Sequence, residues 1–370
     1  MKRRFVSVTL LLLVASLQAA TPKTLPIGER APDFKLPGVD GRDYQLSDFA
    51  KYKFLAVIFT CNHCPTAQSY EERIKAMVAE YRPQGVGFVA ISPNDPNSVR
   101  PDELGYSDLG DSFEDMKIRA EYVGFDFPYL FDGDTQATSM AYGAVATPHV
   151  FIFDEARKLA YAGRVDSTEL RVTPQTVHST RDALEALLAG KTVPEPTTKV
   201  FGCSVKWADK RGLNDRFQQQ WARRDVPLEV IDTAGIKEIV KNSSEKLRLV
   251  NVWATWCGPC VTEFPDLVAM QQWYGHRAFE LVTISADKPK LENKVHRFLK
   301  DKQAANPNFL FNLEDSYALI EAVDPEWQGA LPYTLLIKPG GEIVHREMGA
   351  IDPLEIRRKI VSVIGREKDW

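Results

Sequence analysis

The chain has 370 residues, of which 44% are hydrophobic and 26% are charged. At roughly 100 to 200 residues per domain, this length predicts two domains rather than one, each large enough to bury a core. The formal net charge is −4, and the lysines and arginines are spread over most of the chain, so no basic stripe is present that could neutralise phosphates. We therefore expect no nucleic-acid partner.

The N-terminus has the order of a secretory signal peptide, with a basic start at residues 2–4, an apolar stretch at residues 5–17 and small residues up to Ala20. The apolar stretch is shorter than the ~20 residues that span a bilayer. We predict cleavage near Ala20 and export to the periplasm or an equivalent compartment, with an uncleaved N-terminal anchor as the alternative. No other segment is apolar enough to cross a membrane, so we expect no membrane span after cleavage.

Two close cysteine pairs stand out in the rest of the sequence. Cys61 and Cys64 form the CNHC turn (residues 61–64), Cys257 and Cys260 form the CGPC turn (residues 257–260), and Cys203 is the fifth cysteine. A small scaffold held together by disulfides would be richer in cysteine. Two close pairs in a long chain indicate reactive thiols instead.

The chain repeats one order of elements around the two turns. An apolar run precedes each turn, FLAVIF at residues 54–59 and LRLVNVWA at residues 247–254, and a helical pattern follows. Next come a strand, a helix, a proline that opens another apolar run at residues 147–154 or 331–338, a further strand and a closing amphipathic helix. We therefore predict an α/β fold with two tandem domains, each a central mixed β-sheet flanked by helices. The same order places the first cysteine of each pair at a helix N-terminus.

The two halves differ in length because the first carries a polar loop at residues 92–112. We interpret this loop as a solvated surface insertion, with a lid over the site as the alternative. The proline-rich segment GKTVPEPTTK at residues 190–199 predicts a linker. We place the signal peptide at residues 1–20, the first domain at 21–206 and the second at 207–370.

A Cys-x-x-Cys pair at a helix N-terminus suits thiol-disulfide exchange. The helix dipole and the free N–H groups of the first turn stabilise a thiolate on the first cysteine, and the second cysteine can then close a disulfide. His63 lies within the CNHC turn, and a cation there stabilises the reduced form. We therefore predict a less negative reduction potential for the CNHC turn than for the CGPC turn.

Metal binding is the alternative, chiefly for the first pair. Cys61, Cys64 and His149 offer two thiolates and an imidazole, which suit copper or zinc, so a copper-binding metallochaperone stays open. A structural zinc site would usually show a second close ligand pair, which neither half has, and no histidine follows either pair as covalent haem attachment requires. We expect no bound metal and no cofactor.

The segment NVWATWCGPCVTEFP at residues 251–265 resembles the thioredoxin superfamily, and within it the TlpA/ResA-like thiol-disulfide oxidoreductases. The resemblance extends over about residues 225–370. It implies that Cys257 attacks a substrate disulfide and that Cys260 resolves the mixed disulfide. It also implies that Glu263 is the acid/base group that tunes Cys260, with an exposed helix glutamate as the alternative.

The same resemblance implies a substrate-binding surface around the CGPC turn. Pro332 aligns with the superfamily's cis-proline, which faces the dithiol and pairs with the substrate backbone; a trans proline on an edge strand is the alternative. Trp256, directly before the turn, belongs to the same expected surface.

The segment at residues 27–49 resembles the N-terminus of AhpC/TSA peroxiredoxins and redoxins. In that family the reactive cysteine has a Thr-x-x-Cys-Pro setting and a distant arginine. Here Cys64 fits the reactive cysteine, but Cys61 stands at the threonine and Pro148 at the arginine. The resemblance therefore implies a peroxiredoxin-like scaffold with a thioredoxin-type dithiol and a cis-proline, Pro148, and leaves thiol peroxidase activity as an alternative.

Cys203 lies in GCSVKW, which is similar to a segment that often ends such domains. We expect a buried structural cysteine, because free cysteine packs as a small hydrophobe. A resolving or modulating thiol is the alternative.

Together these features predict an exported thiol-disulfide oxidoreductase that exchanges disulfides with protein substrates through both turns. In an oxidising compartment a reductase needs a source of electrons, and a membrane thiol transporter is the expected kind of donor. We also predict that electrons pass between the two dithiols, because joining them on one chain raises their effective concentration. A redox-inactive adaptor that only binds partners is the remaining alternative.

Overall fold

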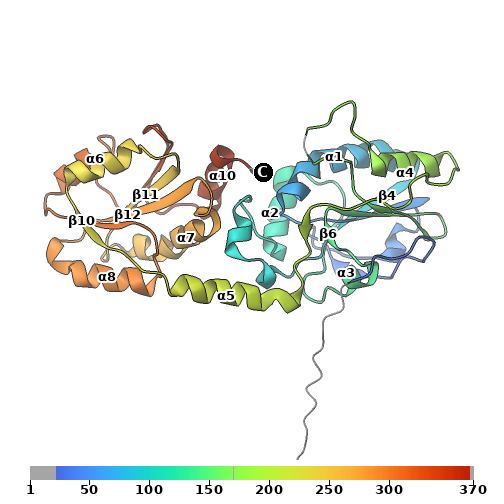
Figure 1. Cartoon of the computed structure of the whole chain (residues 1–370), viewed down its shortest axis with the longest axis horizontal. Helices are drawn as coiled ribbons and strands as arrows, with labels where there is room; N and C mark the ends of the chain where they lie inside the picture. The colour runs from blue at the N-terminus through green and yellow to red at the C-terminus, as the bar shows by residue number, and fades with distance from the viewer. Residues whose placement is uncertain (1–21, 170, 367–370) are drawn as a thin grey trace, which may run out of the picture.

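The computed structural model describes residues 22–169 and 171–366. These residues form two α/β domains, each with a central mixed β-sheet between helices (Figure 1). The predicted fold class is confirmed. The predicted signal peptide lies outside the described residues, and none of the helices that the structure describes is both long and apolar enough to cross a membrane.

Five strands form the first sheet. Their order is β5 (Tyr129–Phe131), β4 (Val86–Ser92), β3 (Phe54–Phe59), β7 (His149–Phe153) and β8 (Leu159–Gly163). β3, β4 and β5 are parallel, whereas β7 and β8 are antiparallel to their neighbours. Every residue of β3 and β4 is buried because both faces of the sheet are covered, and the continuous apolar runs in the sequence reflect this.

Six strands form the second sheet. Their order is β10 (Glu229–Ile231), β13 (Asn308–Phe311), β12 (Phe279–Ser285), β11 (Leu247–Trp253), β14 (Tyr333–Ile337) and β15 (Ile343–Met348). The first four are parallel, and β14 and β15 are antiparallel to their neighbours. The central strand of each sheet, β3 or β11, leads directly into a Cys-x-x-Cys turn.

Helices cover both faces of each sheet. In the first domain they are α1 (Pro65–Tyr81), α2 (Phe113–Val123), α3 (Ala137–Tyr142) and α4 (Ser179–Leu188); in the second they are α6 (Thr233–Lys241), α7 (Gly258–Tyr274), α8 (Glu292–Asp301), α9 (Ser316–Val323) and α10 (Pro353–Ile364). Alternate residues of the central strand enter different layers. Ile58 of β3 packs with α1, α2 and α4, and Val57 packs with α3. Leu249 of β11 packs with α7, α8 and α10, and Val250 packs with α6 and α9.

A short ribbon ties the end of the first domain to its proline loop. β6 (Ala146–Thr147) pairs antiparallel with β9 (Cys203–Ser204), and Thr147 lies opposite Cys203. The remaining short elements are β1 (Lys35–Pro37), β2 (Asp43–Gln45), η1 (Leu46–Phe49), η2 (Arg82–Gln84), η3 (Pro96–Ser98), η4 (Pro101–Leu104), η5 (Ala208–Lys210) and η6 (Pro289–Leu291).

The predicted linker at residues 190–199 is not the connection between the two sheets. Thr197 pairs with Ala162 of β8, and the Ala162 N–H donates to the Pro196 carbonyl at 2.9 Å. This segment therefore packs on the first domain, and its prolines indicate extended chain rather than a free linker.

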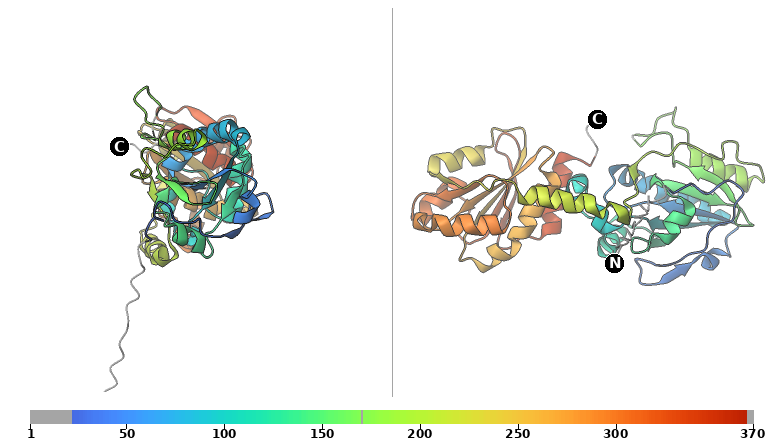
Figure 2. Two further views of the ribbon diagram at one scale, coloured as in Figure 1. Left: turned by 90° about the vertical axis from the view of Figure 1, so that its right-hand side faces the viewer. Right: turned by 60° about the horizontal axis from the view of Figure 1, so that its bottom comes forward.

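The chain crosses between the domains through η5 and α5 (Arg211–Ala222), which lies along both of them (Figure 2). At its start, Arg211 Nε lies 2.6 Å from Asp95 Oδ2 of the first domain. At its end, Trp221 Nε1 donates to the Gln303 carbonyl of the second domain at 3.0 Å. The boundary predicted between residues 206 and 207 falls directly before η5.

The polar loop at residues 92–112 lies between the two domains (Figure 1). The Tyr274 hydroxyl, at the C-terminal end of α7, donates to the Ser107 carbonyl at 2.7 Å. The fully buried Asp108 carboxylate lies 2.7 Å from a guanidinium nitrogen of Arg366. The interpretation as a solvated insertion is therefore wrong, because the second domain buries part of this loop.

Candidate functional site

The CNHC turn joins the end of β3 to the start of α1. Cys64 is the N-cap of α1, and its Sγ accepts a hydrogen bond from the Ala67 N–H at 3.4 Å. Pro65 occupies the first helical position, where its fixed φ and missing N–H are tolerated, so the helix begins after Cys64. The prediction that the first cysteine lies at the helix N-terminus is wrong for this turn.

The two CNHC cysteines lie against the residue before the cis-proline. Cys61 Sγ is 3.1 Å from Thr147 Oγ1, and Cys64 Sγ is 3.3 Å from the Thr147 carbonyl oxygen. The Thr147–Pro148 bond is cis, as the resemblance implies. Both cysteines are reduced and buried, with 3% and 0% of their surface exposed. Thr147 is not among the site residues predicted from the sequence. Its position directly before Pro148 is the sequence signal that could have identified it.

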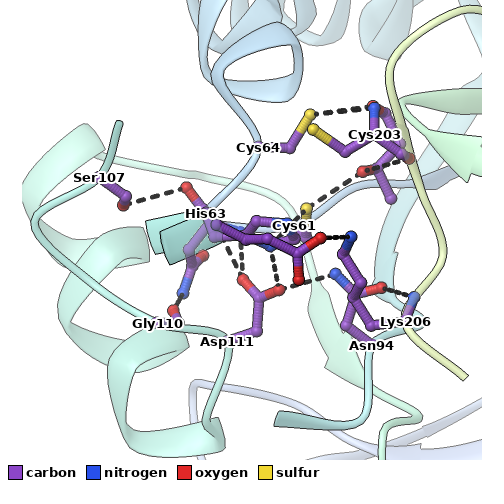
Figure 3. Close-up of polar contacts among 12 residues, drawn as sticks. Cys61, His63, Cys64, Asn94, Ser107, Gly110, Asp111, Cys203 and Lys206 are labelled. Carbon is purple, nitrogen blue, oxygen red and sulfur yellow. Dashed lines mark hydrogen bonds and ion pairs between the residues drawn. The ribbon is translucent and has the colours of Figure 1, made fainter. Parts of the chain in front are cut away.

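A buried ion pair lies beside this dithiol (Figure 3). His63 Nδ1 is 2.5 Å from Asp111 Oδ2 and 3.6 Å from Cys61 Sγ. Asp111 also accepts hydrogen bonds from the His63 N–H at 3.0 Å and from Asn94 Nδ2 at 2.7 Å. Burial opposes both charges, but their mutual attraction outweighs it, so the pKa of His63 is raised and the pKa of Asp111 is lowered. Both shifts favour the charged forms, an imidazolium and a carboxylate.

These surroundings make Cys64 the thiolate of the pair. Burial, the hydrogen bond to Cys64 and the charge of Asp111 all raise the pKa of Cys61. Burial also acts on Cys64, but hydrogen bonds from the Cys203 and Cys61 side chains outweigh it. The positive charge of His63 acts in the same direction, and the pKa of Cys64 falls well below its usual value. The more acidic thiol is therefore the one at the helix N-terminus.

The structure does not assemble the alternative copper set of Cys61, Cys64 and His149. Among the described residues, the one group whose ligand atoms approach within 4.8 Å of one another is Cys61, His63 and Asp111. His149 stands apart from it: its ring packs on a phenylalanine of β7, with 4.3 Å between centroids, and burial lowers its pKa to about 3. Of the three groups that lie close together, His63 and Asp111 already form an ion pair with each other.

A cavity of about 500 Å³ opens beside the CNHC turn. Cys203, His63 and Pro65 line it together with residues of the loop between the domains, whereas Cys61 and Cys64 do not. Cys203 is half-buried, so the expected buried structural cysteine is wrong. The cavity leads solvent to Cys203 and not directly to the dithiol.

The CGPC turn joins β11 to α7. Here Cys257 is the N-cap, and its Sγ accepts from the Cys260 N–H at 3.3 Å, so the first cysteine lies at the helix N-terminus as predicted. The two cysteines form a disulfide, with their Cα atoms 5.3 Å apart. Trp256 is 66% exposed directly before the turn, and the Leu331–Pro332 bond is cis, as the resemblance implies.

Glu263 lies one helical turn after Cys260 and is buried. Its Oε1 accepts from Asn251 Nδ2 at 3.0 Å, and its Oε2 accepts from the Ile351 N–H at 2.9 Å. Burial raises the pKa of Glu263, and the two hydrogen bonds offset this only in part. The alternative of an exposed helix glutamate is therefore wrong. A buried carboxyl with a raised pKa is suited to hold a proton beside a thiol.

Comparison with known families agrees with the repeated turn. Residues 27–162 match the AhpC/TSA family, and residues 232–360 match the redoxin family. The chain carries tandem AhpC/TSA and redoxin domains. The predicted pair of thioredoxin-fold domains, with the peroxiredoxin-like one first, is confirmed.

Curated relatives of these tandem domains include named oxidoreductases. The thiol-disulfide oxidoreductase ResA of Bacillus subtilis (strain 168) is 31% identical over 121 residues, which cover 32% of this chain and 63% of that relative. The chain covers 50% of the length of ResA from Oceanobacillus iheyensis. The thiol:disulfide interchange protein DsbE homologue of Paracoccus denitrificans is 28% identical, covering 39% of this chain and 76% of the relative.

Solved structures match parts of the chain. An uncharacterised conserved protein from Geobacillus kaustophilus is 37% identical and covers 52% of this chain and 98% of its own, with a TM-score of 0.44. A hypothetical protein from Sinorhizobium meliloti 1021 is 32% identical and covers 50% of this chain and 97% of its own, with the same TM-score of 0.44.

Proposed function

We propose that the protein is an exported thiol-disulfide oxidoreductase that exchanges disulfides with protein substrates through both turns. The observation that carries the proposal is shared by the two domains: a Cys-x-x-Cys at a strand-to-helix turn, one cysteine at the helix N-terminus, and a cis-proline. The CGPC cysteines are bonded and the CNHC cysteines are free thiols.

In the second domain, the Cys257 thiolate attacks one sulfur of a substrate disulfide and releases the other as a thiol. Cys260 then attacks Cys257 Sγ, which releases the second substrate thiol and closes the CGPC disulfide. Glu263, one turn along α7, takes the proton that Cys260 loses. Trp256 and the backbone next to Pro332 form the surface that holds the substrate.

The first domain, residues 21–206, carries out the same exchange with Cys64 as its thiolate. In the reducing direction, oxidation of Cys61 and Cys64 to a disulfide supplies the electrons. An exported reductase must then be reduced again, and a membrane thiol transporter is the kind of donor that we propose. The charged, apolar and small-residue order of the N-terminus supports export.

A redox titration of the mature protein tests this function. Alkylation followed by mass spectrometry reports each cysteine separately in buffers of defined thiol/disulfide ratio. Both pairs are expected to titrate as two-electron couples. A CNHC pair that never closes a disulfide, or that purifies with stoichiometric metal, would contradict the proposal for the first domain.

Thiol peroxidase activity of the first domain is a second candidate, and the position of Cys64 favours it. A thiolate at a helix N-terminus, followed by Pro65, can attack a peroxide and become a sulfenic acid with release of water or an alcohol. Cys61 would then form a disulfide with Cys64 and release water. Rapid-mixing kinetics with hydrogen peroxide, and trapping of a sulfenic acid on Cys64 in a Cys61→Ser variant, distinguish this reaction from simple exchange.

A further inference from the structure

The backbone brings Cys203 to the CNHC dithiol. In the β6–β9 ribbon it lies opposite Thr147. Gly202, directly before it, has a φ of 138°, and a Cβ at this position would lie 2.1 Å from the Thr147 carbonyl oxygen. Only glycine permits so close an approach, so the ribbon fixes Cys203 against the proline loop.

Cys64 lies between two other cysteines. The Cys203 N–H donates a hydrogen bond to Cys64 Sγ at 3.4 Å, and Cys203 packs against the small cluster formed by Cys61, Cys64 and Ala67. Figure 3 shows the side chains of Cys64 and Cys203 pointing toward one another. A thiolate with a cysteine on each side can form a disulfide with either one.

The three cysteines differ in their access to solvent. Cys64 is fully buried and Cys61 is 3% exposed, whereas Cys203 is half-buried and lines the cavity beside His63 and Pro65. Disulfide exchange requires the attacking sulfur to reach the disulfide from behind the bond that breaks, so access decides which thiol reacts first. An incoming disulfide meets Cys203 before it can meet either sulfur of the CNHC turn.

We propose that Cys203 is the outer thiol of a three-cysteine relay, in which it exchanges with the substrate disulfide in the cavity and passes the disulfide inward to Cys64 and then to Cys61. This inference rests on the proposed thiol-disulfide exchange and names the residue of the first domain that meets the substrate. The substrate is a disulfide carried on a small molecule or an extended peptide segment, since it must enter a cavity of about 500 Å³.

Each step of the relay exchanges one disulfide for another. Cys203 passes its thiol proton to the neighbouring Cys64 thiolate and attacks the substrate disulfide, which forms a mixed disulfide and releases one substrate thiolate that later takes up this proton. Cys64 attacks Cys203 Sγ, forms the Cys64–Cys203 disulfide and releases the second substrate thiol. Cys61 attacks Cys64 Sγ, which closes the CNHC disulfide and restores the Cys203 thiol. The two electrons gained by the substrate come from Cys61 and Cys64. Cys61 supplies one net proton and solvent supplies the other, because Cys64 starts as a thiolate, and oxidation of a substrate dithiol runs the same steps in reverse.

The relay is tested in the full chain with both CGPC cysteines replaced by serine, so that only the first domain reacts. Oxidised glutathione is the probe, and the products are mapped by mass spectrometry after acid quenching. Cys64→Ser is expected to accumulate glutathione on Cys203, and Cys61→Ser to accumulate a Cys64–Cys203 disulfide. Cys203→Ser and Cys203→Ala are expected to slow oxidation of the CNHC pair at least about tenfold, because the accessible thiol is gone.

Ala208→Ser is the matched control, since it introduces an exposed hydroxyl close to β9 and should leave the rate unchanged. Thermal unfolding of each variant verifies that the first domain is folded. Glutathione on Cys61 in the Cys64→Ser variant, or an unchanged rate in folded Cys203 variants while the CNHC pair still titrates as a two-electron couple, would overturn the relay and leave the proposed function intact. A CNHC pair that does not titrate at all would overturn the proposed function itself.

Discussion

In the CNHC turn the helix begins after the second cysteine, and in the CGPC turn it begins after the first. The position of proline accounts for the difference. Proline favours the first turn of a helix, and it follows the second cysteine in one motif but lies between the cysteines in the other. The same spacing of cysteines therefore places opposite members of the pair at the positive end of the helix dipole.

The two turns also differ in the charged groups beside them. The CNHC turn contains His63, which forms a buried ion pair with Asp111. The CGPC turn contains glycine and proline between its cysteines, and the carboxyl of Glu263 lies one helical turn away. A low pKa for the thiol at a helix N-terminus stabilises the reduced pair. We still predict a less negative reduction potential for the CNHC turn than for the CGPC turn. The thiolate that stabilises its reduced form is on Cys64 rather than on the first cysteine.

The largest expected effect is an inverted response to cysteine substitution. In reduced chains with the other turn changed to serines, Cys64→Ser should remove the ultraviolet thiolate absorbance of the first domain near neutral pH, and Cys61→Ser should retain about one thiolate. In the second domain Cys257→Ser should remove the signal and Cys260→Ser should retain it. Because the pKa of Cys64 is lowered, its thiolate should persist below the pH at which an ordinary thiol is protonated. A signal that follows Cys61 instead would refute the inversion.

The next effect concerns Asp111→Asn, which leaves the buried His63 without its partner. Breaking a buried ion pair should lower the free energy of unfolding by about 3 to 5 kcal/mol in urea denaturation. The raised pKa of His63 stabilises the fold below its ordinary 6.5, and this contribution is lost as pH rises through the folded-state pKa. The lowered pKa of Asp111 stabilises above its ordinary 3.8, and that contribution is lost as pH falls.

The difference between the wild type and Asp111→Asn should therefore be largest between these two ordinary pKa values and smaller at about pH 9. Asp102→Asn is the control, because this aspartate belongs to the same loop but has a side chain 33% exposed in a surface pair with Arg100. Its cost should stay within about 1 kcal/mol at every pH. An equal loss of unfolding free energy for Asp111→Asn between these two pKa values and at about pH 9 would contradict an ionised pair.

Glu263→Gln should have a smaller effect, confined to the second domain. Removing the group that we propose takes the proton of Cys260 should slow resolution of the mixed disulfide by at least about tenfold. Because the pKa of Glu263 is raised, the pH profile of this step should also lose an inflection above the ordinary carboxyl range. Glu292→Gln, an exposed carboxyl at the start of α8 in the same domain, is the control. Normal resolution kinetics in folded Glu263→Gln would remove Glu263 from the mechanism.

The smallest effect is expected for Arg366→Ala, which removes two contacts between the domains, the ion pair with Asp108 and the hydrogen bond to Gln68 Oε1. Asp108 is fully buried, but Arg119 and Arg358 remain within 3.6 and 3.3 Å of it, so the loss in free energy of unfolding should be about 1 to 2 kcal/mol. Both reduction potentials should change little, since Arg366 touches neither turn directly and reaches the CNHC turn only through Gln68, whose Nε2 donates to the Asn62 carbonyl. A shift in one potential would indicate that the domain contact tunes that dithiol.

The sequence predicts the parts of the fold that depend on local pattern. Continuous apolar runs before each turn and helical spacing after it correctly indicate β3 with α1 and β11 with α7. The N-cap position of Cys64 is also predictable locally, because Pro65 follows it and proline favours the first helical position. The spacing of the cysteines alone does not predict it.

The remainder of the first site depends on distant segments. Asp111 is 48 residues from His63, Thr147 is 86 residues from Cys61, and Cys203 is 139 residues from Cys64. No periodicity links such positions, and the polar composition around Asp111 is typical of a solvated loop. Contacts with His63 and Asn94 bury Asp111, and packing of the second domain helps to bury Asp108.

The contact between the domains has a consequence for how many partners the chain can hold. Tyr274 meets the first domain at the C-terminal end of α7, and the CGPC disulfide lies at the opposite end. The helix has 17 residues, so these ends are about 25 Å apart. The domain contact therefore does not press the two dithiols together, and electrons that pass between them need a carrier or a separation of the domains. Separate partner proteins can instead occupy the CGPC turn and the CNHC cavity at the same time.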